Sequence, residues 1–352
     1  MRLDAVWRAT LSVALCVAAA RLAPCFGADS PLEQAGAAHA QLLTHFAQVS
    51  RSMGPGGAAD LDTRLQMDLY ELTSDQRPDG YPVGDWNERL RNIAALDASI
   101  VRQAIVGKSD ELAGSRGLVE RLFVSRADGT LQPFALYIPA TLPANPNLVV
   151  LLHGNPQTES EILAAPQFRQ LADSSGSIVA TPWGRGNYDF APPGADEVYQ
   201  VRDAVASAFH INPRRVFLAG YSMGGFSVFK VGPLHGDRWA GILCISGAIL
   251  NSEASHVVWA LRNTPFYVVT GKQDQSIPAQ YGELTAAFLA GVGIPTEFVE
   301  EPTGTHLVPS LMPSLQTAWA DMIAGIIKHP PTQSTDTLTL GTQPMTSDGM
   351  RP

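Results

Sequence analysis

The chain has 352 residues, of which 45% are hydrophobic and 16% charged, and its formal net charge is −9 at pH 7. This length and composition are sufficient for one large hydrophobic core with an accessory region. Since lysine and arginine form no cluster and do not alternate with aromatic residues, we expect no nucleic acid among the partners. Three cysteines provide no disulfide framework, so the fold must depend on its core.

The first 28 residues have the pattern of a signal peptide. Arg2 and Arg8 give a positively charged start, and residues 9–20 form an apolar segment that is too short for a membrane span. Cleavage near the end of residues 1–28 would leave no stable membrane span. The sequence therefore predicts an exported protein, either secreted or periplasmic.

Residues 29–115 are predicted to form a helical accessory region. Residues 54–57 (GPGG) and the turn sequence at 77–80 interrupt its apolar pattern, which predicts two or three amphipathic helices. We expect these helices to pack on the rest of the protein, with a lid or a partner-binding arm as the alternative. The apolar residues at helical spacing are Leu42, Phe46, Val49 and Met53, followed by Trp86, Leu90, Ile93 and Ile100.

Residues 116–329 are predicted to form an α/β domain. It begins with a hairpin of residues 118–124 and 131–138, joined through the turn pair Asp128-Gly129. Apolar strands then alternate with helical segments, which predicts a mostly parallel central sheet flanked by helices. Further strands are predicted at 148–152, 177–180, 215–219, 241–245, 265–271 and 295–299, and a helix at 196–209. Residues 330–352, rich in Thr, Pro, Gln and Ser, are predicted to be a disordered tail.

Residues 220–225 (GYSMGG) contain the sequence G-x-S-x-G between a predicted strand and a predicted helix. In that setting the motif forms a sharp turn, the nucleophile elbow, which exposes the serine hydroxyl. The glycines leave room for the turn, and the helix that follows directs free main-chain N–H groups at a developing oxyanion. Ser222 is therefore the candidate nucleophile, and an inert turn serine is the alternative.

Two later residues complete the order Ser, Asp, His. Asp274 and His306 each follow a predicted strand, at the edge where parallel sheets build their sites. A serine hydroxyl needs a base to take its proton, and the base needs a carboxylate to fix its tautomer. The alternatives are a helix cap at Asp274, the rival acids Asp189 and Asp237, and the weaker bases His210 and His235.

The strand at 148–152 ends in the loop 153–156 (HGNP). In enzymes with a nucleophile elbow, one oxyanion-hole N–H comes from a loop in this position and the other from the residue after the nucleophile. We assign these donors to Asn155 and Met223. His153 is then a structural loop residue.

Residues 117–328 resemble a serine esterase or peptidase of the α/β-hydrolase superfamily, related to feruloyl esterases, polyhydroxyalkanoate depolymerases and the catalytic domain of prolyl oligopeptidases. The resemblance implies an α/β-hydrolase fold, with Ser222 as nucleophile, Asp274 as acid and His306 as base. The chain departs from those relatives in two ways: many of the esterases have a tryptophan soon after the histidine, and the chain is too short for the propeller of prolyl oligopeptidases. The segments that carry the resemblance are 151–154 (LLHG), 211–225 (INPRRVFLAGYSMGG) and 271–278 (GKQDQSIP).

The remaining reactive residues have structural interpretations. Cys244 lies in an apolar strand and is expected to be a buried, inert thiol. Arg185, Trp183 and Tyr188 either line a substrate pocket or pack as ordinary loop residues, and His329 is expected to be exposed. No His, Asp, Glu or Cys cluster has metal-ligand spacing and no nucleotide-binding glycine motif follows a strand, so we expect no metal and no cofactor.

The sequence as a whole predicts an exported serine hydrolase that cleaves a carboxylic ester through an acyl-enzyme. The substrate would be a small-molecule or polymer-derived ester. Two alternatives stay open, a serine peptidase of the prolyl-oligopeptidase type and a non-catalytic hydrolase-like binding protein. The sequence leaves the acyl and alcohol specificity and the oligomeric state undetermined.

Overall fold

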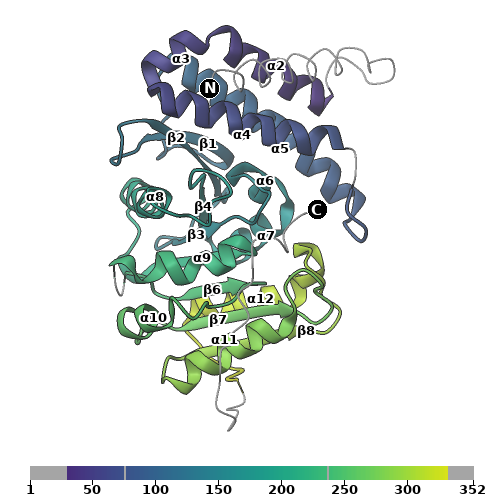
Figure 1. Cartoon of the computed structure of the whole chain (residues 1–352), viewed down its shortest axis with the longest axis vertical. Helices are drawn as coiled ribbons and strands as arrows, with labels where there is room; N and C mark the ends of the chain where they lie inside the picture. The colour runs from purple at the N-terminus through teal and green to yellow at the C-terminus, as the bar shows by residue number, and fades with distance from the viewer. Residues whose placement is uncertain (1–29, 75–76, 236–237, 332–352) are drawn as a thin grey trace, which may run out of the picture.

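The computed structural model describes residues 30–74, 77–235 and 238–331 (Figure 1). The predicted signal peptide, the rival acid Asp237 and the predicted tail from residue 332 onward lie outside these residues. Within the described part of the chain, no helix is long and apolar enough to cross a membrane.

The described residues contain one sheet of eight strands, in the order β1-β2-β4-β3-β5-β6-β7-β8. β1 and β2 form the antiparallel hairpin that the sequence predicts, β2 is antiparallel to β4, and all other neighbouring pairs are parallel. The predicted α/β class and mostly parallel sheet are thus confirmed. The strands are β1 (Gly117–Val124), β2 (Leu131–Ile138), β3 (Asn147–Leu152), β4 (Ser177–Pro182), β5 (Val216–Tyr221), β6 (Ile242–Ile245), β7 (Phe266–Gly271) and β8 (Thr296–Glu301).

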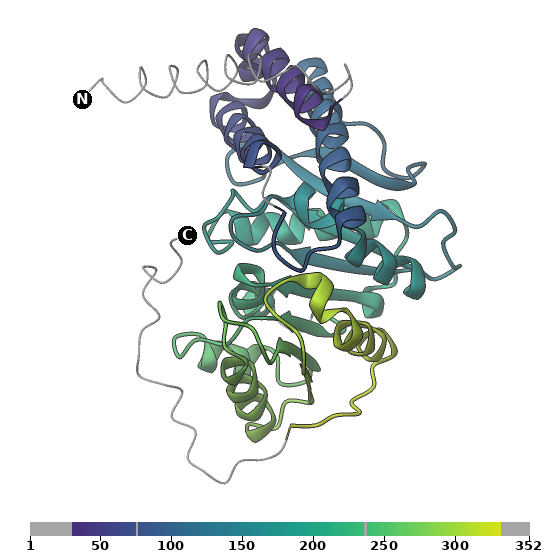
Figure 2. The ribbon, with the colours of Figure 1, turned by 90° about the vertical axis from the view of Figure 1, so that its right-hand side faces the viewer.

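Helices cover both faces of this sheet (Figures 1 and 2). In β3, Leu148, Val150 and Leu152 enter one hydrophobic core, while Val149 and Leu151 enter the other, because successive side chains of a strand point to opposite faces. Burial on both faces explains why the central strands are continuous apolar runs. The face that carries Leu148, Val150 and Leu152 is covered by α8 (Gly194–Ala208), α9 (Met223–Val231), α10 (Ala254–Ala260) and α11 (Ala279–Gly291). The opposite face is covered by α6 (Glu159–Ala164), α7 (Pro166–Ser175) and α12 (Val308–Ala324). Two short 3-10 helices, η1 (Pro213–Arg215) and η2 (Gly232–His235), complete the described elements of this domain.

The helices that precede β1 form a layer at the β1–β2 end of the sheet (Figure 1). The described residues hold four of them, so the predicted number of two or three helices is wrong. The predicted break is present at Gly54, which separates the helix that ends at Met53 from the helix that begins at Pro55. α4 begins at Pro55, inside the predicted break, because proline is tolerated in the first turn of a helix, where its missing N–H is not needed. The helices of the layer are α2 (Pro31–Thr44), α3 (Phe46–Met53), α4 (Pro55–Ser74) and α5 (Val83–Val106).

A buried ion network around Arg64 of α4 connects the helical layer to the α/β domain. The guanidinium of Arg64 contacts four carboxylates that are, like Arg64 itself, fully shielded from solvent. They belong to Asp68 of α4 (3.0 Å), Asp97 of α5, Glu120 of β1 (2.9 Å) and Glu159 of α6 (2.9 Å). Removing one partner from a buried ion network leaves an unpaired charge and costs about 3–5 kcal/mol. The layer is therefore an integral part of the folded protein.

A second buried arginine, Arg89 of α5, makes a similar connection. Its guanidinium contacts Glu71 of α4 (2.8 Å) and Glu161 of α6 (2.9 Å), and lies 5.6 Å from the ring centroid of Trp86. The ion pair between Arg89 and Glu161 thus joins the helical layer to α6, the helix that follows the loop at 153–156.

Three carboxyls of these networks have a raised pKa. Burial raises the pKa of Asp97, Glu120 and Glu161 well above the usual carboxyl range, and neighbouring carboxylates add to the effect. Two guanidinium groups cannot balance all the carboxylates around them. The networks therefore hold protons at pH values where ordinary carboxyls have lost theirs.

Candidate active site

Ser222 occupies the sharp turn between β5 and α9. Its φ is +55° and its ψ is −116°, a backbone conformation that residues other than glycine rarely adopt. The glycines around it are required by space: a Cβ at Gly220 would lie 2.1 Å from the carbonyl oxygen of Gly224, and one at Gly224 would lie 2.2 Å from that of Leu152. The predicted strand–turn–helix geometry is present, and it holds Ser222 at the carboxyl end of β5.

The structure brings Ser222, His306 and Asp274 together from three separate loops. His306 Nε2 lies 2.9 Å from Ser222 Oγ, and His306 Nδ1 lies 2.7 Å from Asp274 Oδ2. The Asp274 side chain is fully buried, whereas 25% of the His306 side chain is exposed. One imidazole thus connects the hydroxyl of the elbow serine to a buried carboxylate, with its outer surface open to solvent.

Main-chain donors orient Asp274. Its Oδ1 accepts hydrogen bonds from the N–H groups of Ser276 (2.9 Å) and Ile277 (2.8 Å), which leaves Oδ2 directed at His306. The alternative role as a helix cap does not apply to α11, because that helix begins at Ala279 with Pro278 at its N-cap. The turn at 274–277 fixes the carboxylate plane.

Tyr221 is a site residue that the sequence analysis did not single out. Its hydroxyl donates a hydrogen bond to the main-chain carbonyl oxygen of His306, and the two rings lie 5.3 Å apart between centroids. Burial raises the pKa of the Tyr221 phenol far above its usual value, with the charge of Asp274 adding to the effect, so the hydroxyl remains a donor. The only sequence signal for it is its place directly before Ser222.

Met223, one of the two assigned oxyanion donors, follows Ser222 directly, and the loop that contains the other, Asn155, packs against the elbow. Met223 is the first residue of α9, and the N–H groups in the first turn of a helix have no partner within the helix. Gly154, the neighbour of Asn155, lies against the elbow, because a Cβ at Gly154 would be 3.2 Å from the Cβ of Ser222. His153 is fully buried, with both ring nitrogens near main-chain carbonyl oxygens at 2.9 and 3.1 Å, as expected for a structural residue.

Comparison with solved structures identifies the fold. The fluorophosphonate-binding serine hydrolase F of Staphylococcus aureus superposes with a TM-score of 0.51 at 18% identity, over 60% of this chain and 99% of that chain. Together with the mostly parallel sheet and the elbow after β5, this decides the architecture. The chain has the α/β-hydrolase fold.

Comparison with known protein sequences finds partial matches to proteins that are named as an esterase and as a polyester depolymerase. The chain is 27% identical over 162 residues to a bifunctional acetylxylan esterase/xylanase of Neocallimastix patriciarum, covering 45% of this chain and 24% of that protein. It is 32% identical over 131 residues to a poly(3-hydroxybutyrate) depolymerase of Ralstonia pickettii, covering 30% of this chain and 27% of that protein. The matches thus span about a quarter of the length of either relative. No protein-family model matches the chain.

A small cavity lies beside Tyr221, the residue before the elbow serine, and the helical layer forms part of its wall. Its volume is about 50 Å³. Tyr81 and Arg89 line it from the layer, opposite Gln157 and Tyr221 of the α/β domain and Leu307, the residue after His306. The layer therefore contributes side chains to a cavity that the neighbours of Ser222 and His306 in the chain also line.

The rival acid and bases make other contacts. Asp189 is mostly exposed and pairs with Lys230 at 3.3 Å. His235 lies 4.0 Å from Asp196, and His210 is exposed. Of the candidates that the structure describes, only His306 is hydrogen-bonded to the elbow serine, and only Asp274 is hydrogen-bonded to His306.

The remaining sequence candidates pack as structural residues. Arg185 forms ion pairs with carboxylates of Asp60, Asp128 and Glu197, and Trp183 is buried and stacks on His153, which favours the loop-packing interpretation. Tyr188 is exposed. Cys244 is fully buried, and burial raises the pKa of its thiol to about 12, as expected for an inert thiol.

Proposed function

We propose that the protein is a serine hydrolase that cleaves carboxylic esters through an acyl-enzyme, with Ser222 as nucleophile, His306 as base and Asp274 as acid. The observation that carries the proposal is the imidazole of His306, hydrogen-bonded on one side to the elbow serine and on the other to a buried carboxylate. Nucleophilic catalysis by serine requires this arrangement of nucleophile, base and orienting group.

In the first half of the reaction, Ser222 Oγ attacks the ester carbonyl carbon while its proton passes to His306 Nε2. The tetrahedral intermediate then collapses, the bond to the alcohol oxygen breaks, and His306 returns the proton to the leaving alcohol. In the second half, His306 takes a proton from water, the resulting hydroxide attacks the acyl carbon, and the acid departs as Ser222 regains its proton. Asp274 keeps Nδ1 protonated and stabilises the imidazolium that forms in each half.

The negative oxygen of each intermediate would be held by the main-chain N–H groups of Met223 and Asn155. Such donors act at the position where charge develops, and the loss of one typically costs about 3 kcal/mol of transition-state stabilisation. Two observations support the assignment: Met223 starts α9, and the loop containing Asn155 packs against the elbow.

For the substrate we propose an ester with a short acyl group, from a small molecule or from a polymer. A cavity of about 50 Å³ has room for roughly three or four water-sized groups. The names of the two partial relatives, an acetylxylan esterase and a poly(3-hydroxybutyrate) depolymerase, support both a short acyl group and a polymeric origin. Action on an extracellular polymer would also agree with the predicted export of residues 29 onward.

The proposal is tested with a fluorophosphonate probe, which forms a phosphorus–oxygen bond to an activated serine with loss of fluoride. We expect the probe to label the wild-type protein at Ser222 and to leave Ser222→Ala unlabelled. Ser227→Ala is the matched control, because Ser227 lies one turn later in α9 with its hydroxyl bonded to the Met223 carbonyl oxygen at 2.8 Å. Labelling that persists in Ser222→Ala would reject Ser222 as the nucleophile.

A substrate panel then separates the remaining alternatives. We expect hydrolysis of acetyl and butyryl esters and little hydrolysis of aminoacyl amides. Faster cleavage of the amides would indicate a peptidase. A folded wild-type protein that is neither labelled nor active on any substrate would indicate a binding protein with a hydrolase-like fold.

A further inference from the structure

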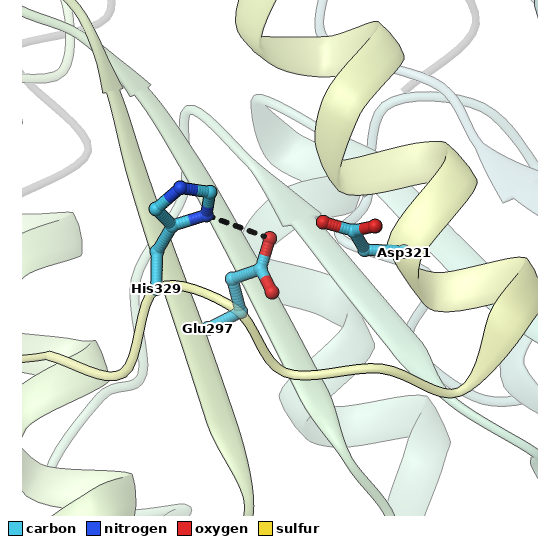
Figure 3. Close-up of side chains that lie close together, drawn as sticks. All are labelled: Glu297, Asp321 and His329. Atoms are coloured by element: carbon cyan, nitrogen blue, oxygen red, sulfur yellow. Dashed lines mark ion pairs between the residues drawn. The ribbon is translucent and has the colours of Figure 1, made fainter.

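Three side chains of metal-binding type meet at the end of the sheet away from Ser222. Glu297 of β8, Asp321 of α12 and His329 of the segment after α12 each offer a ligand atom, and these atoms all lie within 4.8 Å of one another (Figure 3). Glu297 is the second residue of β8, whereas His306 follows the carboxyl end of that strand. The cluster is therefore separate from the candidate active site.

Each carboxylate of the cluster has one oxygen engaged and one oxygen without a hydrogen-bond partner among the described residues. Glu297 Oε2 accepts from the main-chain N–H of Lys328 at 2.8 Å, and Asp321 Oδ1 contacts the Lys328 ammonium. Glu297 Oε1 and Asp321 Oδ2 are buried and lack such a partner in this part of the chain. Figure 3 shows the Asp321 carboxyl group and the His329 ring directed toward Glu297 from opposite sides.

A fourth polar group, the phenol of Tyr267, faces the same place. Tyr267 stands directly opposite Glu297 in the β7–β8 register, so their side chains emerge on the same face of the sheet. This is the face that α12 covers, since Tyr267 and Met322 belong to one hydrophobic core. Tyr267 is fully buried, and its hydroxyl has no hydrogen-bond partner among the described residues.

Buried oxygens without a hydrogen-bond partner destabilise the folded protein, because polar groups removed from water need a partner. A buried carboxylate also needs a compensating positive charge. The two carboxylates carry two negative charges, and the Lys328 ammonium balances one of them. His329 Nδ1 lies 3.5 Å from Glu297 Oε1, which is longer than a hydrogen bond. A cation between these atoms would supply both the missing charge and the missing contacts.

We propose that Glu297 Oε1, Asp321 Oδ2 and His329 Nδ1 bind a divalent transition-metal cation, for which Zn²⁺ is the best fit. Imidazole nitrogen together with carboxylate oxygen is a donor set that suits Zn²⁺, whereas Ca²⁺ and Mg²⁺ prefer oxygen ligands alone. Water or the Tyr267 hydroxyl would complete a tetrahedral site. The cation has a route of entry, because 54% of the His329 side chain is exposed.

The bound cation would have a structural role. β8 is the edge strand of the sheet, and the segment after α12 runs beside it, since the N–H of Phe298 donates to the carbonyl oxygen of His329 at 2.9 Å. A cation on these three ligands would therefore join the edge strand, its covering helix and the segment that follows, and protect that edge of the sheet.

The test uses the full chain without a polyhistidine tag, treated with a chelator and dialysed. Titration with ZnCl₂ in a calorimeter should show one site per chain, and Zn²⁺ at about a hundred times its Kd should raise the Tm by roughly 5 °C. CaCl₂ and MgCl₂ should give a much smaller shift. His329→Ala should weaken Zn²⁺ binding at least tenfold and remove the Tm shift, with little effect on the metal-free Tm because His329 is exposed.

His256→Ala is the matched control, since His256 is an exposed histidine of α10 outside the cluster. It should bind Zn²⁺ like the wild type. Asp321→Asn, which keeps the size of the side chain, should weaken binding as His329→Ala does. Absence of a Zn²⁺ site in the wild-type chain would overturn the proposal, and so would undiminished binding by His329→Ala.

Discussion

The phenol of Tyr221 donates a hydrogen bond to the main-chain carbonyl oxygen of His306, and so ties the residue before the elbow serine to the histidine that faces that serine. Asp274 holds the same histidine through its ring. The position of His306 is therefore fixed twice, once at the imidazole and once at the backbone. This second restraint leads to the first prediction.

We expect Tyr221→Phe to lower kcat by about 3–10-fold with little change in KM. The substitution retains the ring beside His306 and removes one hydrogen bond, whose net worth is about 0.5–1.5 kcal/mol. Tyr221 acts here as a positioning residue, so the effect should appear in the chemical step and in the rate of fluorophosphonate labelling. Steady-state kinetics on a short-chain ester provide the measurement. A variant with unchanged kcat would show that Asp274 alone is sufficient to hold His306.

Asp274→Asn is predicted to fold and to lose about 10³–10⁴-fold in kcat. An amide has nearly the same shape as the carboxylate, and its oxygen can still accept from the N–H groups of Ser276 and Ile277. Its NH₂ group, however, can donate to His306 Nδ1 and so stabilise the wrong tautomer, in which Nε2 is protonated and cannot act as base. Circular dichroism checks the fold and ester hydrolysis checks the rate. Wild-type turnover in a folded variant would move the role of acid to another residue, Asp237 or Asp189.

The buried carboxyl network predicts a stability that decreases as the pH rises. In the unfolded chain, carboxyls lose their protons near pH 4, whereas the raised pKa values of Asp97, Glu120 and Glu161 keep these groups protonated to higher pH in the folded protein. Over that interval the folded state binds more protons, so the free energy of unfolding falls with increasing pH. Urea unfolding measured from pH 5 to pH 9 should show the decrease.

Glu120→Gln is the variant that isolates this effect. Glutamine resembles the protonated carboxyl, and it removes one negative charge from a network in which a single guanidinium faces four carboxylates. We expect a smaller pH dependence than in the wild type, with the largest gain in stability at pH 9. Glu300→Gln serves as the control, because Glu300 makes a surface ion pair with the largely exposed Lys272. Equal pH slopes in all three proteins would contradict the predicted protonation of the network.

The sequence predicted the features that depend on local patterns. The strands could be predicted because burial on both faces makes them continuous apolar runs. The elbow could be predicted because only glycine fits at positions 220 and 224, where a Cβ would collide with a main-chain carbonyl oxygen. The structure brings Asp274 and His306 to Ser222 as their places after β7 and β8 suggested. Their catalytic roles stay a prediction until the variants are measured.

The features that the sequence did not predict depend on contacts between distant segments. α4 was missed because glycine and proline at its start outweighed the apolar spacing of Leu61, Leu65 and Leu72. Nothing in the neighbourhood of Arg64 indicates that its partners come from β1 and α6. The cluster of Glu297, Asp321 and His329 escapes the usual metal-ligand spacings because its members lie on three different elements.

The place of Tyr81 in the cavity wall leads to the last prediction, which concerns specificity. Tyr81 lies just before α5, is buried, and packs edge-on against Trp86 with the ring centroids 5.5 Å apart. Tyr81→Leu keeps an apolar side chain at this position but shortens it, which enlarges the cavity that Tyr221 and Leu307 also line. We expect the ratio of kcat/KM for a hexanoyl ester over an acetyl ester to rise about fivefold, since one methylene in an apolar pocket is worth about 1–3 kcal/mol. Tyr70→Leu is the control, because Tyr70 of α4 is 72% exposed. If Tyr81→Leu labelled normally with a small fluorophosphonate and kept the wild-type ratio, the helical layer would not set the acyl specificity, and its role would be limited to the buried networks of Arg64 and Arg89.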